Sequence, residues 1–350
     1  MFHVTDLFQY VQSTREFKIW QLRKNQDLPT DKYAYYFLSD LGVNLTSKCN
    51  LNCSHCCFKE YLNSDKIFDY EKFYNFLNTY LRDFKGDKLM LHLNCGEITM
   101  IDVSELFSFL YNCVDIFKNH NIRLGIRINS NLMKVSKDHL YFFKICKEVC
   151  EYFNQPFIFI TSTDYYHINS NNLNRHIANI QKLQNIGISV NCNTLLTTHK
   201  ELQKLKTLYK DLNTKFILQI EKDFENLDND CNKLTLSEQF KTYLKDNKID
   251  VSLHVFGCSK YRLKSIYTYN NTLVQCPFFA PFQSDWKVEP TKISNIKDIY
   301  EKPIFQVQRY LMDYTNMYSY SMCPILFYYN KHRDNIKSTT GDINANCSRS

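Results

Sequence analysis

Glycine and proline are scarce in this 350-residue sequence, which contains seven residues of each. At an average usage of about 7%, glycine alone would number about 25 in a chain of this length. Collagen-like repetition is therefore excluded, and motifs that normally contain glycine are expected in altered form. The sequence is instead 44% hydrophobic and 15% aromatic, which excludes disorder and predicts a large buried core.

The sequence also lacks any apolar run approaching the roughly 20 residues that a membrane span needs. Its start, MFHVTDLFQYVQSTREF, does not have the basic-then-apolar layout of a signal peptide, so a cytoplasmic protein without a membrane partner is expected. The formal net charge is +7, and the lysines are scattered along the chain instead of forming one block. This weak, dispersed charge does not favour a nucleic-acid partner.

Short apolar runs alternate with longer amphipathic stretches through the middle of the chain. Strand-like runs occupy residues 41–45, 88–94, 122–128, 157–162, 188–193 and 215–221. Helix-like segments occupy residues 69–84, 103–119, 136–153, 171–185, 199–211 and 236–246. Six consecutive βα units imply parallel strands joined by right-handed crossovers. We therefore predict an α/β fold, a partial (β/α)6 TIM-like barrel with helices outside.

The pattern changes at both ends of this repeating region. Residues 1–38 are predicted to form a helical extension packed against the barrel, which spans 39–247. Residues 248–330 are aromatic-rich and irregular with several prolines, and they predict a small C-terminal α+β domain. Residues 331–350 form a polar tail.

The sequence contains 14 cysteines without a secretion signal, which indicates reduced thiols used for metal binding or catalysis. The segment TSKCNLNCSHCCFKEY follows the first predicted strand and places Cys49, Cys53 and Cys56 in CxxxCxxC spacing. Three thiolates on one loop favour an iron–sulfur cluster with one iron open to a substrate or cosubstrate. Two alternatives are a zinc site, which usually has four ligands, and buried structural cysteines.

This loop resembles the signature of the radical S-adenosylmethionine (radical SAM) superfamily, and further segments match in the same order. LHLNCGEITM is similar to the family's GGEP segment, and RINSNLM is similar to its TNG segment. ITSTDYYHI and ISVNCNTLL resemble the segments at the ends of the fourth and fifth strands. The matched positions are Cys95, Gly96, Glu97, Ser130, Asn131, Ser162, Asp164 and Asn193.

The resemblance implies a [4Fe–4S] cluster held by the three cysteines and S-adenosylmethionine (AdoMet) bound to its open iron. Cleavage of AdoMet would give a 5′-deoxyadenosyl radical that abstracts hydrogen from a substrate, and a low-potential donor such as flavodoxin or ferredoxin would supply the electron. Glu97 and the backbone near Gly96 would hold the methionine ammonium, while Ser162 and Asn193 would orient the carboxylate or ribose. Ser130, Asn131 and Asp164 are further candidates for cofactor binding.

Two residues depart from the family pattern. Cys95 replaces the first glycine of GGEP, and it is either a weak candidate for a catalytic thiol or tolerated drift in a glycine-poor chain. His55 lies between the second and third cluster cysteines, where it would pack near the adenine or face solvent. The remaining helix, strand and loop cysteines, Cys113, Cys146, Cys150, Cys192 and Cys231, are expected to behave as small hydrophobic residues.

The C-terminal region resembles a reduced SPASM or twitch auxiliary-cluster domain. Cys258 and Cys276 lie 18 positions apart, with Asn271 in place of the turn glycine, and Cys323 falls where the next ligand would come. The resemblance implies at most one further Fe–S cluster, with Cys347 or a substrate group as fourth ligand. A degenerate domain without metal is the alternative.

The substrate class is open at this stage. SPASM-like appendages favour a ribosomally synthesised peptide as substrate, so a peptide maturase is the first hypothesis. A radical SAM enzyme acting on a small metabolite such as a sugar or aminoglycoside is the second. The third is a non-catalytic metal-binding scaffold, which the altered glycine motif suggests.

Overall fold

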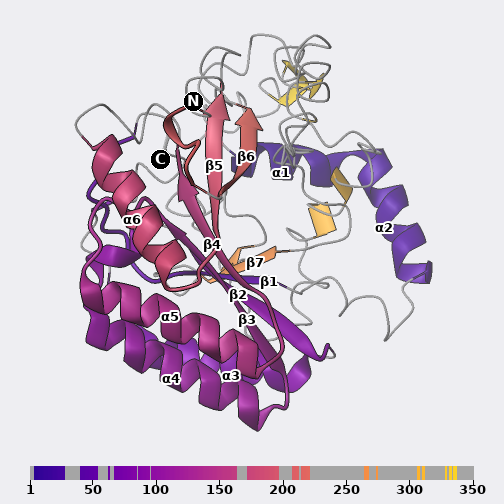
Figure 1. Ribbon diagram of the computed structural model, residues 1–350. Coiled ribbons are helices and arrows are strands. Elements are labelled where there is room, and N and C mark those ends of the chain that lie inside the picture. Colours follow the sequence, from indigo (N-terminus) through magenta and orange to yellow (C-terminus); the bar gives the residue numbers. More distant parts are fainter. Residues whose placement is uncertain are drawn as a thin grey trace.

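The fold was analysed in a computed structural model, shown in Figure 1. The structure describes residues 4–27, 40–53, 62–63, 67–84, 86–94, 96–163, 172–196, 207–212, 214–220, 264–267, 273–274, 306–307, 310–311, 328, 331–332 and 334–336. The predicted helix over 236–246 and the auxiliary-cluster residues Cys258, Cys276, Cys323 and Cys347 lie outside these ranges.

An eight-stranded sheet forms the centre of the molecule, with strand order β6-β5-β4-β3-β2-β1-β7-β8. The six predicted strands are β1 (Asp40–Asn44), β2 (Lys88–Asn94), β3 (Arg123–Ser130), β4 (Phe157–Ser162), β5 (Val190–Leu196) and β6 (Thr214–Ile220). Neighbours within this set are parallel, as expected for successive βα units. The sequence analysis missed β7 (Lys264–Tyr267), which pairs parallel to β1, and β8 (Leu273–Val274), which pairs antiparallel to β7.

Three successive helices lie side by side along one face of β1–β3 (Figure 1). These are α3 (Tyr70–Asp83), α4 (Val103–Asn119) and α5 (Lys137–Tyr152), and α6 (Leu173–Asn185) packs beside β5. Polar N-caps set where the helices begin: the Asp102 carboxylate accepts from the backbone N–H of Ser104, and Ser136 forms a capping box with His139. The short 3₁₀ helix η3 (Ile98–Met100) precedes α4.

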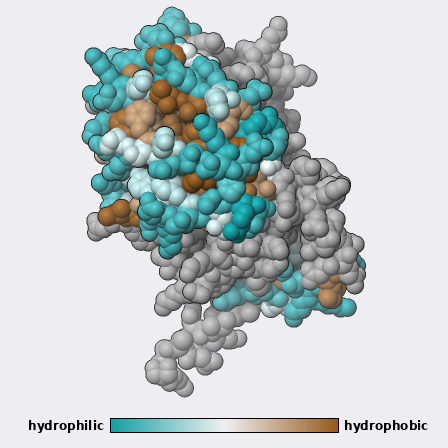
Figure 2. Space-filling model, turned by 90° about the horizontal axis from the view of Figure 1, so that it is seen from below, coloured by the Kyte–Doolittle hydropathy of each residue, from teal (hydrophilic) through white to brown (hydrophobic). Residues whose placement is uncertain are grey.

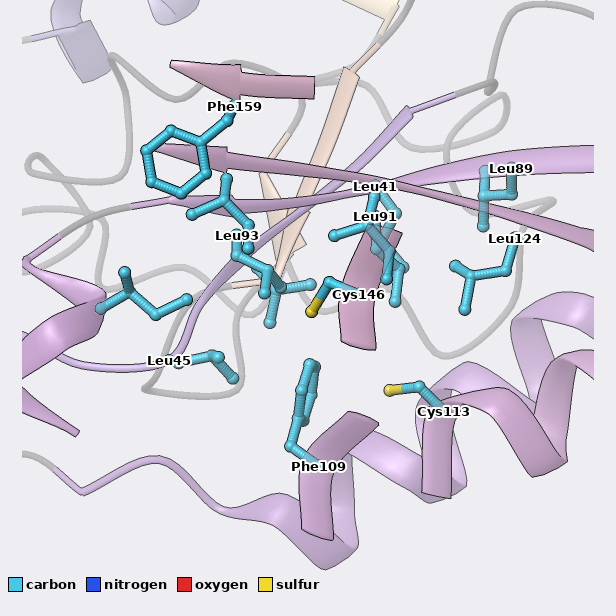
Figure 3. Packing of buried hydrophobic residues seen from close by; sticks show 14 of the residues in the cluster. Leu41, Leu45, Leu89, Leu91, Leu93, Phe109, Cys113, Leu124, Cys146 and Phe159 are labelled. Atoms are coloured by element: carbon cyan, nitrogen blue, oxygen red, sulfur yellow. The ribbon is translucent and has the colours of Figure 1, made fainter. Parts of the chain in front are cut away.

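Alternate strand residues point toward these helices and form the core (Figure 3). Leu91 and Leu93 of β2 and Leu124 of β3 are buried there, facing Phe109 of α4 and its neighbours. Each fully buried leucine contributes roughly 1.5–3 kcal/mol relative to an exposed one. This regular apolar spacing explains why the strand positions are readable from sequence.

The cysteines of the helical layer behave as predicted for small hydrophobic residues. Cys113 of α4 and Cys146 of α5 are fully buried in the same core, and burial raises the pKa of both thiols well above the ordinary value. Burial also raises the pKa values of Cys150 and Cys192 to about 12. These thiols stay protonated at neutral pH and are poor metal ligands. Cys231 lies outside the described residues.

The predicted N-terminal helical extension forms two helices, α1 (Val4–Ser13) and α2 (Arg15–Asp27). Their contacts connect the two ends of the chain. Phe17 lies edge-on to Tyr310, with ring centroids 5.4 Å apart, and the Gln21 side-chain amide donates to Gln306 at 2.6 Å. The extension therefore packs against residues near the C-terminus, a partner that the sequence pattern did not indicate.

Figure 2 looks onto the molecule from the side of α3–α5 and shows hydrophobic residues gathered within a mostly hydrophilic face. Tyr111 of α4 and Tyr141 of α5 are among the exposed aromatic residues. Within the described ranges, no helix combines the length and apolar character needed to cross a membrane.

Candidate active site

The cysteine loop begins directly after β1, at the carboxyl end of the sheet where parallel-barrel enzymes place their active sites. Cys53 is buried and Cys49 is half-buried. The Cys49 sulfur accepts hydrogen bonds from the Leu51 backbone N–H at 3.5 Å and from the Asn131 amide at 3.9 Å. Such N–H···S bonds stabilise a metal-bound thiolate and tune the potential of a cluster. Cys56, His55 and Cys95 lie outside the described residues.

Asn63 fixes the path of this loop from a point 14 residues downstream of Cys49. Its side-chain oxygen accepts from the Cys49 backbone N–H at 3.0 Å, and its own N–H donates to the Ser47 carbonyl at 2.8 Å. Asn63 adopts a φ of 57°, which asparagine tolerates better than most residues. The sequence analysis did not single out Asn63, although an asparagine shortly after a ligand loop is a weak signal for such a turn.

Gly96 brings the end of β2 into direct contact with the cysteine loop. Its φ is +57°, and a β-carbon at this position would lie 2.5 Å from the Thr46 carbonyl oxygen and 2.7 Å from that of Lys48. The backbone N–H of Glu97 donates to the same Lys48 carbonyl at 2.8 Å. Only glycine permits both the positive φ and this approach of two backbones. Gly96 is therefore the position of the CGE segment at which only glycine fits.

The carboxylate of Glu97 is 1% exposed and links β2 to β3. One oxygen accepts from the Thr99 backbone N–H at 3.1 Å, the Thr99 hydroxyl at 2.8 Å and the Ser130 hydroxyl at 2.6 Å. The other oxygen accepts from the Asn131 backbone N–H at 2.6 Å. Hydrogen bonds of this kind compensate a buried carboxylate for its lost hydration. Glu97 thus orders the end of β3, a role the sequence pattern did not reveal.

Asn131 extends this network back to the cysteine loop. Its amide donates to the Asn50 side-chain oxygen at 2.9 Å as well as to the Cys49 sulfur, and its own oxygen accepts from the Met133 N–H at 2.9 Å. Three predicted site residues, Glu97, Ser130 and Asn131, are therefore joined to Cys49 in one hydrogen-bonded unit.

Leu132 occupies the third position of the TNG-like segment and adopts a φ of 58°, a conformation natural for the glycine that stands there in TNG. The Asn179 amide, on α6, donates to the Leu132 carbonyl at 2.7 Å and supports this turn. Asn179 is 3% exposed. A polar residue on the buried face of α6 was the available signal, and the sequence analysis did not use it.

Ser162, the last residue of β4, lies opposite Asn193 in the middle of β5. The Asn193 carbonyl accepts from the Thr163 N–H at 2.8 Å, while the buried Asn193 side-chain oxygen has no hydrogen-bond partner in the part of the chain that the structure describes. A buried acceptor left unsatisfied indicates a site for a donor group from a ligand. These two residues have no hydrogen bond to the Glu97 network within the described part of the chain, and Asp164 lies outside it.

Comparison with known proteins bears on the fold. No family model matches the chain, and no curated protein does. Among solved structures, native anSMEcpe with bound AdoMet and Cp18Cys peptide matches 87% of this chain and 99% of its own, at 14% identity and a TM-score of 0.55. Native anSMEcpe with bound AdoMet matches 86% and 99%, at 14% identity and a TM-score of 0.57.

This chain shares the anSMEcpe fold. The predicted partial (β/α)6 barrel is therefore confirmed, both by the strand order and by this similarity. The match spans almost the whole anSMEcpe chain, so the likeness extends beyond a generic βα unit.

Proposed function

We propose that this protein is a radical SAM enzyme that acts on a peptide. The observation that carries the proposal is the hydrogen-bonded unit connecting Cys49, Glu97 and Asn131, because it gathers three separately predicted motifs at one edge of the sheet. The shared fold supports it, since anSMEcpe was captured with AdoMet and with a peptide. The structures of anSMEcpe with bound peptides are also the reason why a peptide is favoured over a small metabolite as substrate.

In this proposal Cys49, Cys53 and Cys56 hold a [4Fe–4S] cluster. The residues fit that group, because two thiols share one loop and the Cys49 sulfur already receives two N–H donors. When bound, the reduced cluster and AdoMet supply a 5′-deoxyadenosyl radical that abstracts hydrogen from the substrate. Glu97 has one oxygen with a single donor, which leaves it capacity to accept from the methionine ammonium.

On the other side of the site, Asn193 and Ser162 would orient the ribose or carboxylate of AdoMet. The unpartnered Asn193 oxygen supports this role. Asp164 and Cys95 remain candidates, as do Cys258, Cys276 and Cys323 for a second cluster. The division into an extension over 1–38, a barrel over 39–247, an auxiliary region over 248–330 and a tail over 331–350 is likewise part of the proposal.

The first test is anaerobic iron–sulfur reconstitution of the full chain. We expect about four iron atoms per chain from the barrel cluster, or about eight with an auxiliary cluster, and dithionite-driven release of 5′-deoxyadenosine from AdoMet. Cys49→Ala should lose the barrel iron and the cleavage. Cys146→Ala is the matched control, because that buried thiol lies in the helical core and should leave both unchanged.

Three results would contradict the proposal. Zinc in place of iron would indicate a structural metal site, and iron without AdoMet cleavage under any reductant would indicate a scaffold. Iron retained in Cys49→Ala would show that the CxxxCxxC loop is not the ligand set.

The proposed activity also requires a low-potential electron donor such as flavodoxin or ferredoxin. A pocket of about 380 Å³ opens beside the cysteine loop, where Asn50 and Leu51 meet Lys134 and Arg175. Both basic residues are exposed, and within the described part of the chain neither forms a salt bridge. A positive surface next to a cluster loop suits an acidic redox protein.

Charge reversal tests this docking surface. We expect Lys134→Glu combined with Arg175→Glu to slow flavodoxin-driven AdoMet cleavage about ten-fold at low salt, with a smaller effect at high salt. Cleavage driven by dithionite should be unchanged, because that small reductant needs no docking surface. Equal losses with both reductants would show damage to the site itself and would refute docking at this pocket.

A further inference from the structure

The face of the sheet opposite α3–α5 is polar, although buried parallel strands usually present apolar residues on both sides. Side chains alternate along a strand, so the residues between the core leucines and isoleucines point to this second face. We call it the polar face. Its polar members on β1, β2, β3 and β5 include Asn44, His92, Asn94, Arg127, Asn129, Asn191 and Asn193, while β4 contributes the apolar residues Ile158 and Ile160.

The strand register places these residues opposite one another on adjacent strands. Arg127 lies opposite His92, and one level higher Asn129 lies opposite Asn94, which in turn lies opposite Asn44. Asn129 donates its amide hydrogen to the Asn94 oxygen at 3.1 Å. Arg127 stands three residues before Ser130, so it lies about 10 Å below the edge that carries the Glu97 network.

Several polar atoms on this face are buried and have no hydrogen-bond partner among the described residues. They are the Nε of Arg127, the Oδ1 of Asn129 and both side-chain polar atoms of Asn44, besides the Asn193 Oδ1 that the proposed function assigns to AdoMet. Each such atom costs about 1–3 kcal/mol when left unsatisfied, so native proteins rarely group them. Their concentration on one face indicates a ligand that supplies the missing partners.

The charge on this face identifies the kind of ligand. Arg127 brings a guanidinium group to this face, and no carboxylate among the described residues forms an ion pair with it. Arg123, on the same strand, contrasts with it, because that guanidinium pairs with Asp87. Asp40 also lies on the polar face. It pairs with Met90, which pairs with Gly125, so it lies two residues nearer the start of the strands than Arg127.

We infer that Arg127 binds a carboxylate group of the substrate, while the unpartnered asparagine oxygens accept hydrogen bonds from N–H groups of the same peptide. A guanidinium matches a carboxylate through two parallel N–H···O bonds, which fix orientation as well as affinity. This inference rests on the proposed function, because it assumes that the substrate is a peptide and specifies which of its groups Arg127 would bind. The group is either an acidic side chain or the C-terminal carboxylate.

A peptide-library selection distinguishes these two sources. The reconstituted full chain, immobilised with AdoMet, is exposed to acetylated decapeptides of random sequence, synthesised with either free or amidated C-termini. We expect wild type to enrich Asp and Glu about ten-fold over Asn and Gln, or to recover free-ended peptides about ten-fold over amidated ones. The first result assigns a side chain, and the second assigns the terminus.

Variants at two arginines of β3 test whether Arg127 is the residue that causes the carboxylate preference. Arg127→Gln should abolish the preference for carboxylates. Arg127→Lys should keep part of this preference, because lysine retains the positive charge but cannot form two parallel N–H···O bonds. Arg123→Gln is the matched control and should select like wild type, since its side chain already pairs with Asp87.

Three outcomes would overturn the inference: no carboxylate preference in wild type, an unchanged preference in Arg127→Gln, or, where Arg127→Gln fails to fold, an Arg127→Lys chain that selects like wild type. The last would show that the guanidinium geometry plays no part in the selection. Iron content and AdoMet cleavage of the wild type separate this test from the proposed function. A chain that selects acidic peptides without cleaving AdoMet contradicts only the latter.

Discussion

Gly96→Ala is expected to prevent assembly of the iron–sulfur cluster while leaving a folded protein. The new methyl group would stand 2.5 Å and 2.7 Å from two carbonyl oxygens of the cysteine loop, at Thr46 and Lys48. Contacts this short force one backbone away, and the loop that carries Cys49 and Cys53 is the one that must move. The positive φ adds a strain of about 1 kcal/mol. Iron content after reconstitution should fall from about four atoms per chain to less than one.

Gly187→Ala provides the matched control. Gly187 also has a positive φ, 77°, but apart from its two chain neighbours no atom of the described residues lies within 4 Å of the position that its β-carbon would take. This variant should lose about 1 kcal/mol of folding free energy and keep its iron. Equal iron loss in both variants would show that backbone strain, and not contact with the cysteine loop, controls cluster assembly.

Glu97→Gln is expected to lower the free energy of unfolding by about 3 kcal/mol. The two carboxylate oxygens accept from two backbone N–H groups, those of Thr99 and Asn131, which cannot rotate away. An amide has only one oxygen, so either orientation of glutamine sets its NH2 group against a backbone donor. At 1% exposure, water cannot compensate. Denaturant unfolding measured without metal would give this value independently of cofactor binding.

Glu105→Gln is the control for that measurement. Glu105 is exposed at the start of α4, and its carboxylate accepts from the Tyr70 hydroxyl at 3.3 Å. Its replacement should change stability by less than about 0.5 kcal/mol. A comparably small change for Glu97→Gln would refute the role of Glu97 in ordering the end of β3.

Periodicity in the sequence was sufficient to locate the six parallel strands and the helices α3–α6. Core leucines at alternate positions of β2 and apolar residues along one face of α4 repeat with the spacing of their element, so local sequence carries the signal. The ends of β1, β3, β5 and β6 differ from the prediction by one to three residues, because end residues are fixed by pairing with neighbours. The CxxxCxxC loop was equally readable, since its residues are close in the chain.

The tertiary structure decided which distant residues meet. Glu97 contacts Ser130 and Asn131 from more than 30 residues away, and β7 pairs with β1 across more than 220 residues. The polar face likewise appears only when register sets Arg127 beside His92. Such contacts depend on how strands pack and in what order, which no local pattern encodes. The sequence by itself therefore determined the six parallel strands, the helices α3–α6 and the cysteine loop. The three-dimensional packing alone decided the place of β7, the partners of Glu97, the crowding at Gly96 and the surroundings of Arg127.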